Sequence, residues 1–231
     1  MISGRDIFTR LQKTVVKCHQ CSRLVEWRER VASEKVKRYR TEKYWGRPLP
    51  AFGDPGARLI IIGLAPAAHG GNRTGRLFTG DRSGDWLFEA LHHFGFAGQP
   101  TSVSRDDGLK LYDALITAAL RRAPPDNMPL PEEMDNCRVY LRQELQLLNS
   151  GRVVVLLGQI AFHAFFKAWR ETGGQMPARM PKFHHSAEFV MPERLTVIAS
   201  YHPSQQNTQT GKLTRAMFHQ IFRRAREILD Q

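Results

Sequence analysis

The sequence predicts an α/β fold in a single domain over residues 1–231, with helices covering both faces of a parallel sheet. Short continuous apolar runs occur at residues 59–62, 153–157 and 195–200, and the first two are followed by glycine. Runs of this kind are typical of strands that are buried on both faces. Segments with helical spacing of apolar residues separate the runs, and this alternation is the pattern of parallel β-α-β units.

Composition supports one domain and a basic surface. The chain has 231 residues, of which 42% are hydrophobic, and this is enough for one substantial core. Lys and Arg outnumber Asp and Glu by 34 to 22, which gives a formal net charge of +12. A surplus of this sign is expected of a protein that binds a polyanion. No apolar signal segment or membrane-spanning run is present in the sequence, so we expect a cytoplasmic protein that does not enter a membrane. We also expect a monomer.

The first part of the chain contains two ambiguous signals. A helix is predicted over residues 5–17, and it ends at the C-x-x-C turn formed by Cys18 and Cys21. Such a turn is compatible with zinc, an iron–sulfur cluster, a redox disulfide or no ligand at all. Residues 28–47 then mix many Lys and Arg residues with aromatic ones, which suits a nucleic-acid surface and equally a solvated helix face.

Residues 63–84, GLAPAAHGGNRTGRLFTGDRSG, follow the first strand and contain six of the 18 glycines. Glycine lets backbone N–H groups approach a ligand closely, so polar side chains among glycines favour a binding loop over a long mobile loop. The later elements follow from apolar spacing. They are a helix near 86–94 with Ser83 as N-cap, a strand within 109–120 where a helix also fits, a helix from Pro131, a strand at 153–157, a helix at 159–169, a strand at 195–200 and a helix at 212–229.

Polar loops leave three of the predicted strands. They begin at Gly63, at Pro124 in the APPDN segment, and at His202 in the HPSQQN segment. Ligand loops of parallel sheets lie at the carboxyl ends of the strands, so the three loops are expected to converge on one site.

These loops together resemble the type B branch, also called family 5, of the uracil-DNA glycosylase superfamily. The resemblance is carried by GLAPAAHGGNRTGRLFTGDRSG, APPDN and HPSQQNTQTGKLT, and extends in outline from Cys18 to the last helix. It implies a three-layer α/β/α fold around a four-stranded parallel sheet, and the removal of uracil and some other deaminated bases from DNA. A base in a duplex must be extruded before an enzyme can act on it.

The resemblance assigns roles to several side chains. Phe78 is expected to stack on the extruded base, and Asn127 to read its hydrogen-bonding edge. His202 and the backbone of Gly63, Leu64 and Ala65 are expected to stabilise the departing base anion. Two structural alternatives remain: Phe78 as a core residue and His202 as a turn residue.

The type B branch lacks a carboxylate directly after the first strand, and this sequence has Leu64 and Ala65 there. Asp81 is the nearest acid in the loop, and we expect it to position water or stabilise the sugar cation, with His69 and Asn72 as further candidates. Asp81 is also a candidate helix cap. The segment around Ser204 is expected to press on the DNA backbone, with Gln205 or Gln206 as the wedge and Asn207 supporting the loop.

Members of the branch typically hold an iron–sulfur cluster with four cysteines. Cys18, Cys21 and Cys137 lie at three of these positions, but the remaining position is Arg122. Because all the cysteines of the chain lie at ligand positions, we favour a bound cluster with a missing or non-cysteine ligand. A cluster-free protein with neutral thiols and a zinc site are the alternatives.

The leading functional hypothesis is a monofunctional uracil-DNA glycosylase that leaves an abasic site. The alternative is a non-catalytic or product-retaining protein that binds uracil or abasic DNA, because Arg122 alters the support of the pocket. A nucleotide-binding α/β enzyme is disfavoured, since the first strand is followed by neither a phosphate loop nor a dinucleotide fingerprint.

Overall fold

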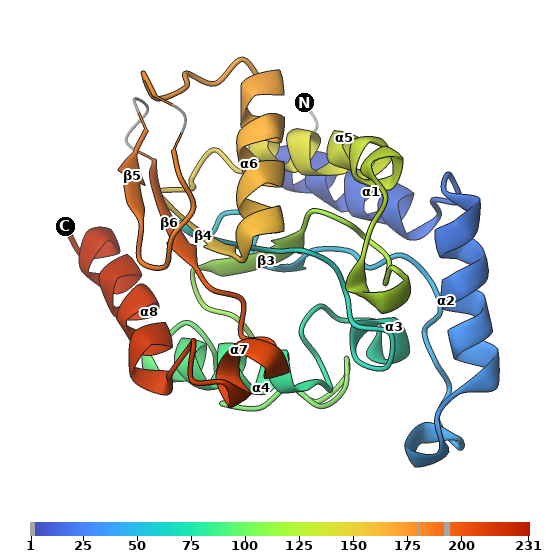
Figure 1. Cartoon of the computed structure of the whole chain (residues 1–231). Coiled ribbons are helices and arrows are strands. Elements are labelled where there is room, and N and C mark those ends of the chain that lie inside the picture. The colour runs from blue at the N-terminus through green and yellow to red at the C-terminus, as the bar shows by residue number, and fades with distance from the viewer. Residues whose placement is uncertain (1–2, 180, 192–194) are drawn as a thin grey trace.

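The computed structural model describes residues 3–179, 181–191 and 195–231 (Figure 1). The α-helices of this part of the chain are α1 (Gly4–Val16), α2 (Ser22–Glu34), α3 (Gly71–Thr74), α4 (Arg82–His93), α5 (Pro131–Leu147), α6 (Gln159–Glu171), α7 (Gln205–Gln209) and α8 (Arg215–Leu229). Two 3₁₀ turns are η1 (Lys37–Tyr39) and η2 (Pro125–Asn127). The strands are β1 (Phe52–Gly53), β2 (Leu59–Gly63), β3 (Ala114–Ala118), β4 (Val153–Leu157), β5 (Glu188–Val190) and β6 (Thr196–Ser200).

The sheet has the order β1-β3-β2-β4-β6-β5. Its four inner strands are parallel to one another, and β1 and β5 pair antiparallel at the two edges. The prediction of a four-stranded parallel sheet is therefore incomplete, because the described residues form a mixed six-stranded sheet. The edge strands have no long apolar run to reveal them: β1 has two residues, and none of the three residues of β5 is buried.

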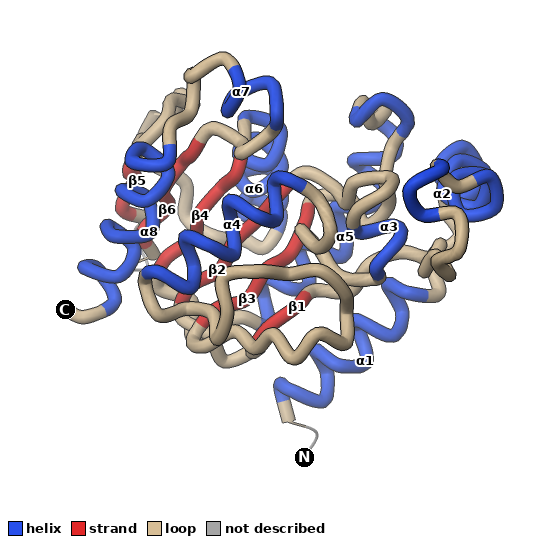
Figure 2. The backbone as a smooth tube through the Cα atoms, turned by 90° about the horizontal axis from the view of Figure 1, so that it is seen from below, coloured by secondary structure: helices blue, strands red, loops and turns tan. Residues whose placement is uncertain are grey.

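Helices cover both faces of the sheet (Figure 1). Leu59 and Ile61 of β2 point into a core shared with α4 and α8, while Ile60 and Ile62 point into a second core shared with α5 and α6. Figure 2, seen from below, shows α4 and α8 lying across the first of these faces. The α/β prediction is confirmed, because adjacent residues of one strand are buried on opposite faces.

The helices differ from the predicted ones in several details. The first helix, α1, lies close to the predicted range 5–17, and it buries Phe8 while Ile7 beside it is 44% exposed. Asp81 rather than Ser83 caps α4. The helix that Pro131 opens is confirmed, and the strand alternative is correct for β3. The apolar spacing does not reveal α2 or α7, whose surfaces are mainly polar. No helix in the described ranges is long and apolar enough to span a membrane.

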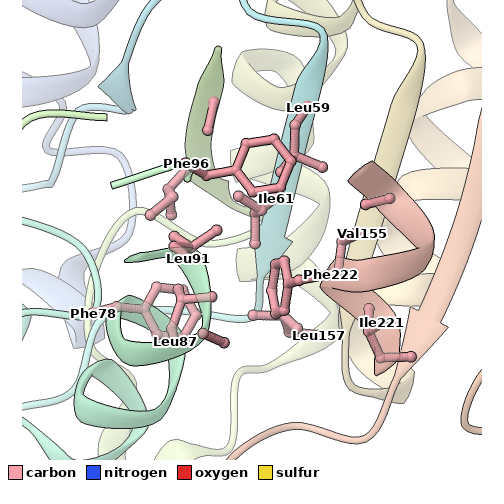
Figure 3. Close-up of a cluster of buried hydrophobic side chains, with 14 of the residues drawn as sticks. Leu59, Ile61, Phe78, Leu87, Leu91, Phe96, Val155, Leu157, Ile221 and Phe222 are labelled. Carbon is pink, nitrogen blue, oxygen red and sulfur yellow. The ribbon is translucent and has the colours of Figure 1, made fainter. Parts of the chain in front are cut away.

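The glycine-rich stretch is a compact structure that includes α3. A Cβ on Gly63 would lie 2.7 Å from the Phe78 ring, and a Cβ on Gly84 would lie 1.8 Å from the Phe78 carbonyl oxygen. Phe78 itself has a positive φ of 53° and packs against Leu87 in the core that faces α4 (Figure 3). Glycine at these two positions therefore lets the loop fold back on the strand that it leaves.

Candidate active site

The three polar loops meet at one cavity at the carboxyl edge of the sheet. The cavity has a volume of about 820 Å³. Its lining includes His69 and Asp81 from the loop after β2, Asn127 from the loop after β3, and Gln205 from α7 after β6. The parallel register of β2, β3, β4 and β6 brings these loops to the same edge. The convergence that the strand pattern predicts is therefore present.

Asp81 lies at the cavity wall and also caps a helix. Its carboxylate accepts a hydrogen bond from the Gly84 backbone N–H at 2.9 Å. A Cβ on Gly70 would lie 2.2 Å from the Asp81 Oδ2 atom, so only glycine allows the carboxylate to take this position. Burial raises the pKa of Asp81 above its ordinary range, in opposition to the backbone hydrogen bonds from Gly84 and Ser83. The Asp81 side chain can therefore cap α4 and line the cavity at the same time.

His69 lies on the same wall as Asp81. Its Nδ1 atom is 3.1 Å from the Tyr44 hydroxyl, and the two rings meet edge to face. Burial, with a smaller contribution from Arg73, lowers the pKa of His69. The imidazole is therefore neutral at physiological pH and able to exchange a hydrogen bond with a ligand.

Asn127 is presented by a stiff turn. Pro124 and Pro125 precede it, and the backbone N–H of Asn127 donates to the Pro124 carbonyl oxygen at 3.2 Å, which closes η2. Asp126 and Asn127 both have positive φ angles, 53° and 57°, a conformation that asparagine tolerates better than most residues. The Asn127 side chain is exposed at the cavity, where its amide can both donate and accept hydrogen bonds.

His202 and Phe78 pack against each other, and neither is among the residues that line this cavity. Their ring centroids are 6.0 Å apart with an interplanar angle of 28°. Burial lowers the pKa of His202 to about 4, so the ring is neutral near pH 7. The Asn207 amide donates to the His202 carbonyl oxygen at 2.9 Å and holds the turn. Phe78 is 7% exposed and belongs to the core, which is the structural alternative that the sequence leaves open.

The other predicted site residues occupy supporting positions. Asn72 is 1% exposed, and its amide donates to the Arg28 carbonyl oxygen at 3.3 Å, which ties α3 to α2. The Ser204 hydroxyl caps α7 by accepting from the Asn207 N–H at 3.4 Å. Gln206 is exposed on the same short helix. Asn72 therefore holds the loop, and the Ser204 segment presents α7 at the rim.

A buried ion pair fixes the second half of the glycine-rich stretch. The Arg76 guanidinium donates to Asp107 and to the Ser102 hydroxyl, in each case at 2.7 Å. Although burial opposes ionisation, Arg76 and the backbone N–H groups of residues 103, 104 and 109 hold the pKa of Asp107 at about 2. The loop that carries Asp81 is therefore anchored to the segment after α4.

The residues at the predicted cluster site do not fit a standard four-cysteine cluster. Cys21 and Cys137 are buried together in a small apolar group, but the fourth position holds Arg122, which is 2% exposed. The Arg122 guanidinium donates to the Cys18 carbonyl oxygen and brings a positive charge to the position at which the resemblance implies a fourth cysteine. In the described ranges no group of three or more His, Cys, Asp or Glu side chains is arranged to hold a metal ion. The iron–sulfur prediction is not supported by this arrangement.

The cavity also has lining residues that the sequence reasoning does not select. Trp27, Arg38, Tyr39 and Arg73 line it together with the predicted residues. The mixture of basic and aromatic residues over 28–47 is the sequence signal that could have pointed to these lining residues. It does not show that this segment packs against the glycine-rich loop, because the two segments are far apart in the sequence.

Comparison with known proteins agrees with this geometry. The sequence profile of the uracil DNA glycosylase superfamily matches residues 50–226. A type-5 uracil-DNA glycosylase of Thermus thermophilus is 47% identical over 94% of this chain and 95% of its own length. Proteins with the same name from Pyrobaculum aerophilum and Mycobacterium bovis are 46% and 42% identical, over 91% and 99% of this chain and 88% and 84% of their own lengths. On the extent of these matches and on the convergence of the three loops, the chain belongs to the uracil DNA glycosylase superfamily.

Proposed function

We propose that this protein is a type-5 uracil-DNA glycosylase, which hydrolyses the N-glycosidic bond of uracil in DNA and leaves an abasic site. The observation that carries the proposal is that Asp81 and Asn127, from loops after different strands, line the same cavity. The names and extensive similarity of the relatives support the same activity. Other deaminated bases are proposed as further substrates.

The extruded base is recognised and its leaving charge is stabilised by separate groups. Asn127 reads the hydrogen-bonding edge of the base, since its amide offers both a donor and an acceptor. Cleavage of the bond places negative charge on the base. His202 and the backbone of Gly63, Leu64 and Ala65 do not line the cavity itself, and we propose that they come within reach of this charge when the base is bound. The neutral imidazole of His202 and the backbone N–H groups of that segment then donate hydrogen bonds to it. Phe78 supports this surface by its contact with His202.

Asp81 acts on the sugar side of the bond. Its carboxylate positions the attacking water or stabilises the positive charge that develops on the sugar. His69 lies on the same wall and assists in orienting water. The cap on α4 and the close contact with Gly70 hold the carboxylate in one place before the substrate arrives, and preorganisation of this kind is what electrostatic catalysis requires.

The rim of the cavity receives the DNA. Ser204 and α7 press on the backbone beside the target nucleotide, and Gln205 or Gln206 fills the space that the base leaves, with Asn207 supporting the turn. Extrusion costs a few kcal/mol and least for a mismatched base, so a uracil opposite guanine is favoured over one in a normal pair. We propose that the chain acts as a single-domain monomer.

A second candidate is a protein that binds uracil or abasic DNA without turnover. The observation that favours it is the buried Arg122, which changes the support beneath the loop that carries Asn127. Tight binding of uracil-containing DNA with no release of uracil distinguishes this candidate from the enzyme.

The test of the proposed activity is an excision assay. Purified protein is incubated with single-stranded and double-stranded oligonucleotides that carry one uracil, and abasic sites are detected as breaks in hot alkali. We expect breaks at the uracil position and free uracil in equal amount. An oligonucleotide with thymine in place of uracil serves as the control. The absence of alkali-sensitive sites on both substrates would contradict the proposal.

A further inference from the structure

The outer wall of the cavity is built by a segment that precedes the superfamily match. Trp27 of α2 and Arg38 and Tyr39 of η1 line the same cavity as Asp81 and Asn127. The match to the superfamily begins only at residue 50. In Figure 1, α2 and the turn that follows it extend from the sheet on the side of α3. This wall is thus an addition to the part of the fold that matches the superfamily.

Arg73 fixes the wall to the glycine-rich loop. Its guanidinium carbon lies 3.8 Å from the centroid of the Tyr39 ring, and the same guanidinium forms an ion pair with Glu42. It also donates to the backbone carbonyl oxygens of His69 at 2.7 Å and Gly80 at 3.2 Å. The Arg73 side chain is 7% exposed although its partner Glu42 is 44% exposed, so the guanidinium is fixed in the protein and holds Tyr39 in a defined orientation beside the catalytic loop.

The exposed side of the wall has the chemistry of a single-stranded nucleic-acid surface. Tyr39 is half-buried, and the exposed Arg38 guanidinium lies 5.2 Å from its ring centroid. Lys37 and Arg40, which flank these residues, are also exposed. An aromatic face stacks on any base, and neighbouring cations attract the phosphates on either side of it.

We propose that Arg38 and Tyr39 bind the nucleotide next to the extruded one on the same DNA strand. Tyr39 stacks on the neighbouring base with the ring face that Arg73 does not cover, and the exposed Arg38 moves off the ring to pair with the adjoining phosphate. This inference rests on the proposed glycosylase function, because it takes the cavity to hold the extruded base. The wall then contributes to the affinity for DNA, while the bond-breaking step stays with the loops after β2, β3 and β6.

The proposal predicts a separation between binding and chemistry. Tyr39→Leu keeps an apolar side chain but removes the aromatic face, and Arg38→Ala removes the guanidinium. Each is expected to raise KM about tenfold for a single-stranded oligonucleotide with one uracil, since stacking or a phosphate contact is lost. The rate constant at saturating substrate is expected to stay within about twofold of the wild type, because neither group contacts the reacting bond. Arg38→Ala is also expected to flatten the slope of log affinity against log salt by about 0.7.

Arg170→Ala is the matched control, because Arg170 is exposed on α6 and does not line the cavity. It is expected to leave KM and the salt slope unchanged. The proposal would be overturned if KM stayed unchanged in both Arg38→Ala and Tyr39→Leu. It would also be overturned if Arg170→Ala raised KM as much as these two variants do. Affinity for the same oligonucleotide is also measured by fluorescence anisotropy in an Asp81→Asn background. That measurement tests the wall even if the wild type excises no uracil, so failure of the inference and failure of the proposed function are distinguishable.

Discussion

Asp81 shows how one residue can serve the fold and the chemistry together. It closes the first turn of α4 by accepting the Gly84 N–H, and it lines the cavity that receives the base. Backbone hydrogen bonds lower the pKa of a solvent-exposed capping carboxylate, whereas burial raises the pKa of Asp81 in spite of them. Burial lowers the pKa of His202 to about 4, and the imidazole is therefore neutral near pH 7. As the pH falls, Asp81 therefore loses its negative charge at a higher pH than an ordinary aspartate, and His202 gains a positive charge only near pH 4.

These shifts predict the pH dependence of excision. The proposed roles require ionised Asp81 and neutral His202, so the single-turnover rate is expected to fall as pH decreases through the raised pKa of Asp81, and also near pH 4 where His202 gains its proton. His202 is not expected to contribute a decrease near pH 6.5, where an ordinary histidine titrates. Asp81→Asn is expected to lower the rate by ~10² or more and to remove the decrease that Asp81 causes. A wild-type profile that is flat down to pH 4, or a decrease near pH 6.5 that remains in Asp81→Asn, would contradict these roles.

At the scale of elements, Arg122 joins two segments that the sequence separates widely. Its guanidinium links the turn between α1 and α2 to the start of the loop that ends at Asn127. Three cysteines belong to the same region, and burial raises the pKa of Cys137. An iron–sulfur cluster would make a similar link through four thiolates. In this protein the buried Arg122 side chain makes the link through its hydrogen bond to the Cys18 carbonyl oxygen.

The role of Arg122 predicts the metal content of the protein and of one variant. Anaerobically purified wild type is expected to contain no stoichiometric iron, because Arg122 supplies a guanidinium at the position for which the resemblance implies the fourth thiolate. Arg122→Cys is expected to bind iron and to gain the broad visible absorbance of a cluster. Arg122→Ser, which supplies no thiolate, is the control and is expected to remain colourless. Stoichiometric iron in the wild type, shown by metal analysis and absorbance, would contradict this account.

The elements that the sequence predicts well are those with a strong local signal. The buried runs of β2, β4 and β6 are apolar nearly throughout, and proline opens α5 in its first turn. The edge strands β1 and β5 are short and depend on pairing with β3 and β6, so their own residues carry little signal. The sequence places the cap of α4 two residues late because Ser83 is also a good capping residue by type.

At the scale of the whole molecule, the convergence of the loops is predictable and the outer wall is not. Parallel strands place the loops after β2, β3 and β6 at one edge, and this follows from strand order and direction alone. The approach of Tyr39 to Arg73 depends on the path of the chain after α2, which no local pattern determines. The same limit applies to Phe78, because only the folded loop shows how much of its ring is buried.

The central claim is that loops from three different strands form one catalytic site. Its most direct test is the single-turnover rate of uracil excision by Asn127→Ala. Asn127 lines the cavity from the loop after a different strand than Asp81, and its exposed amide does not pack in the core. Asn149→Ala, at an exposed position before β4 on the opposite edge of the sheet, is the matched control. The account predicts a decrease of ~10² to 10³ for Asn127→Ala and no effect of the control. The melting temperature of Asn127→Ala is expected to fall by only a few degrees, because alanine tolerates the positive φ of this position less well than asparagine. A rate for Asn127→Ala close to that of the wild type would contradict it.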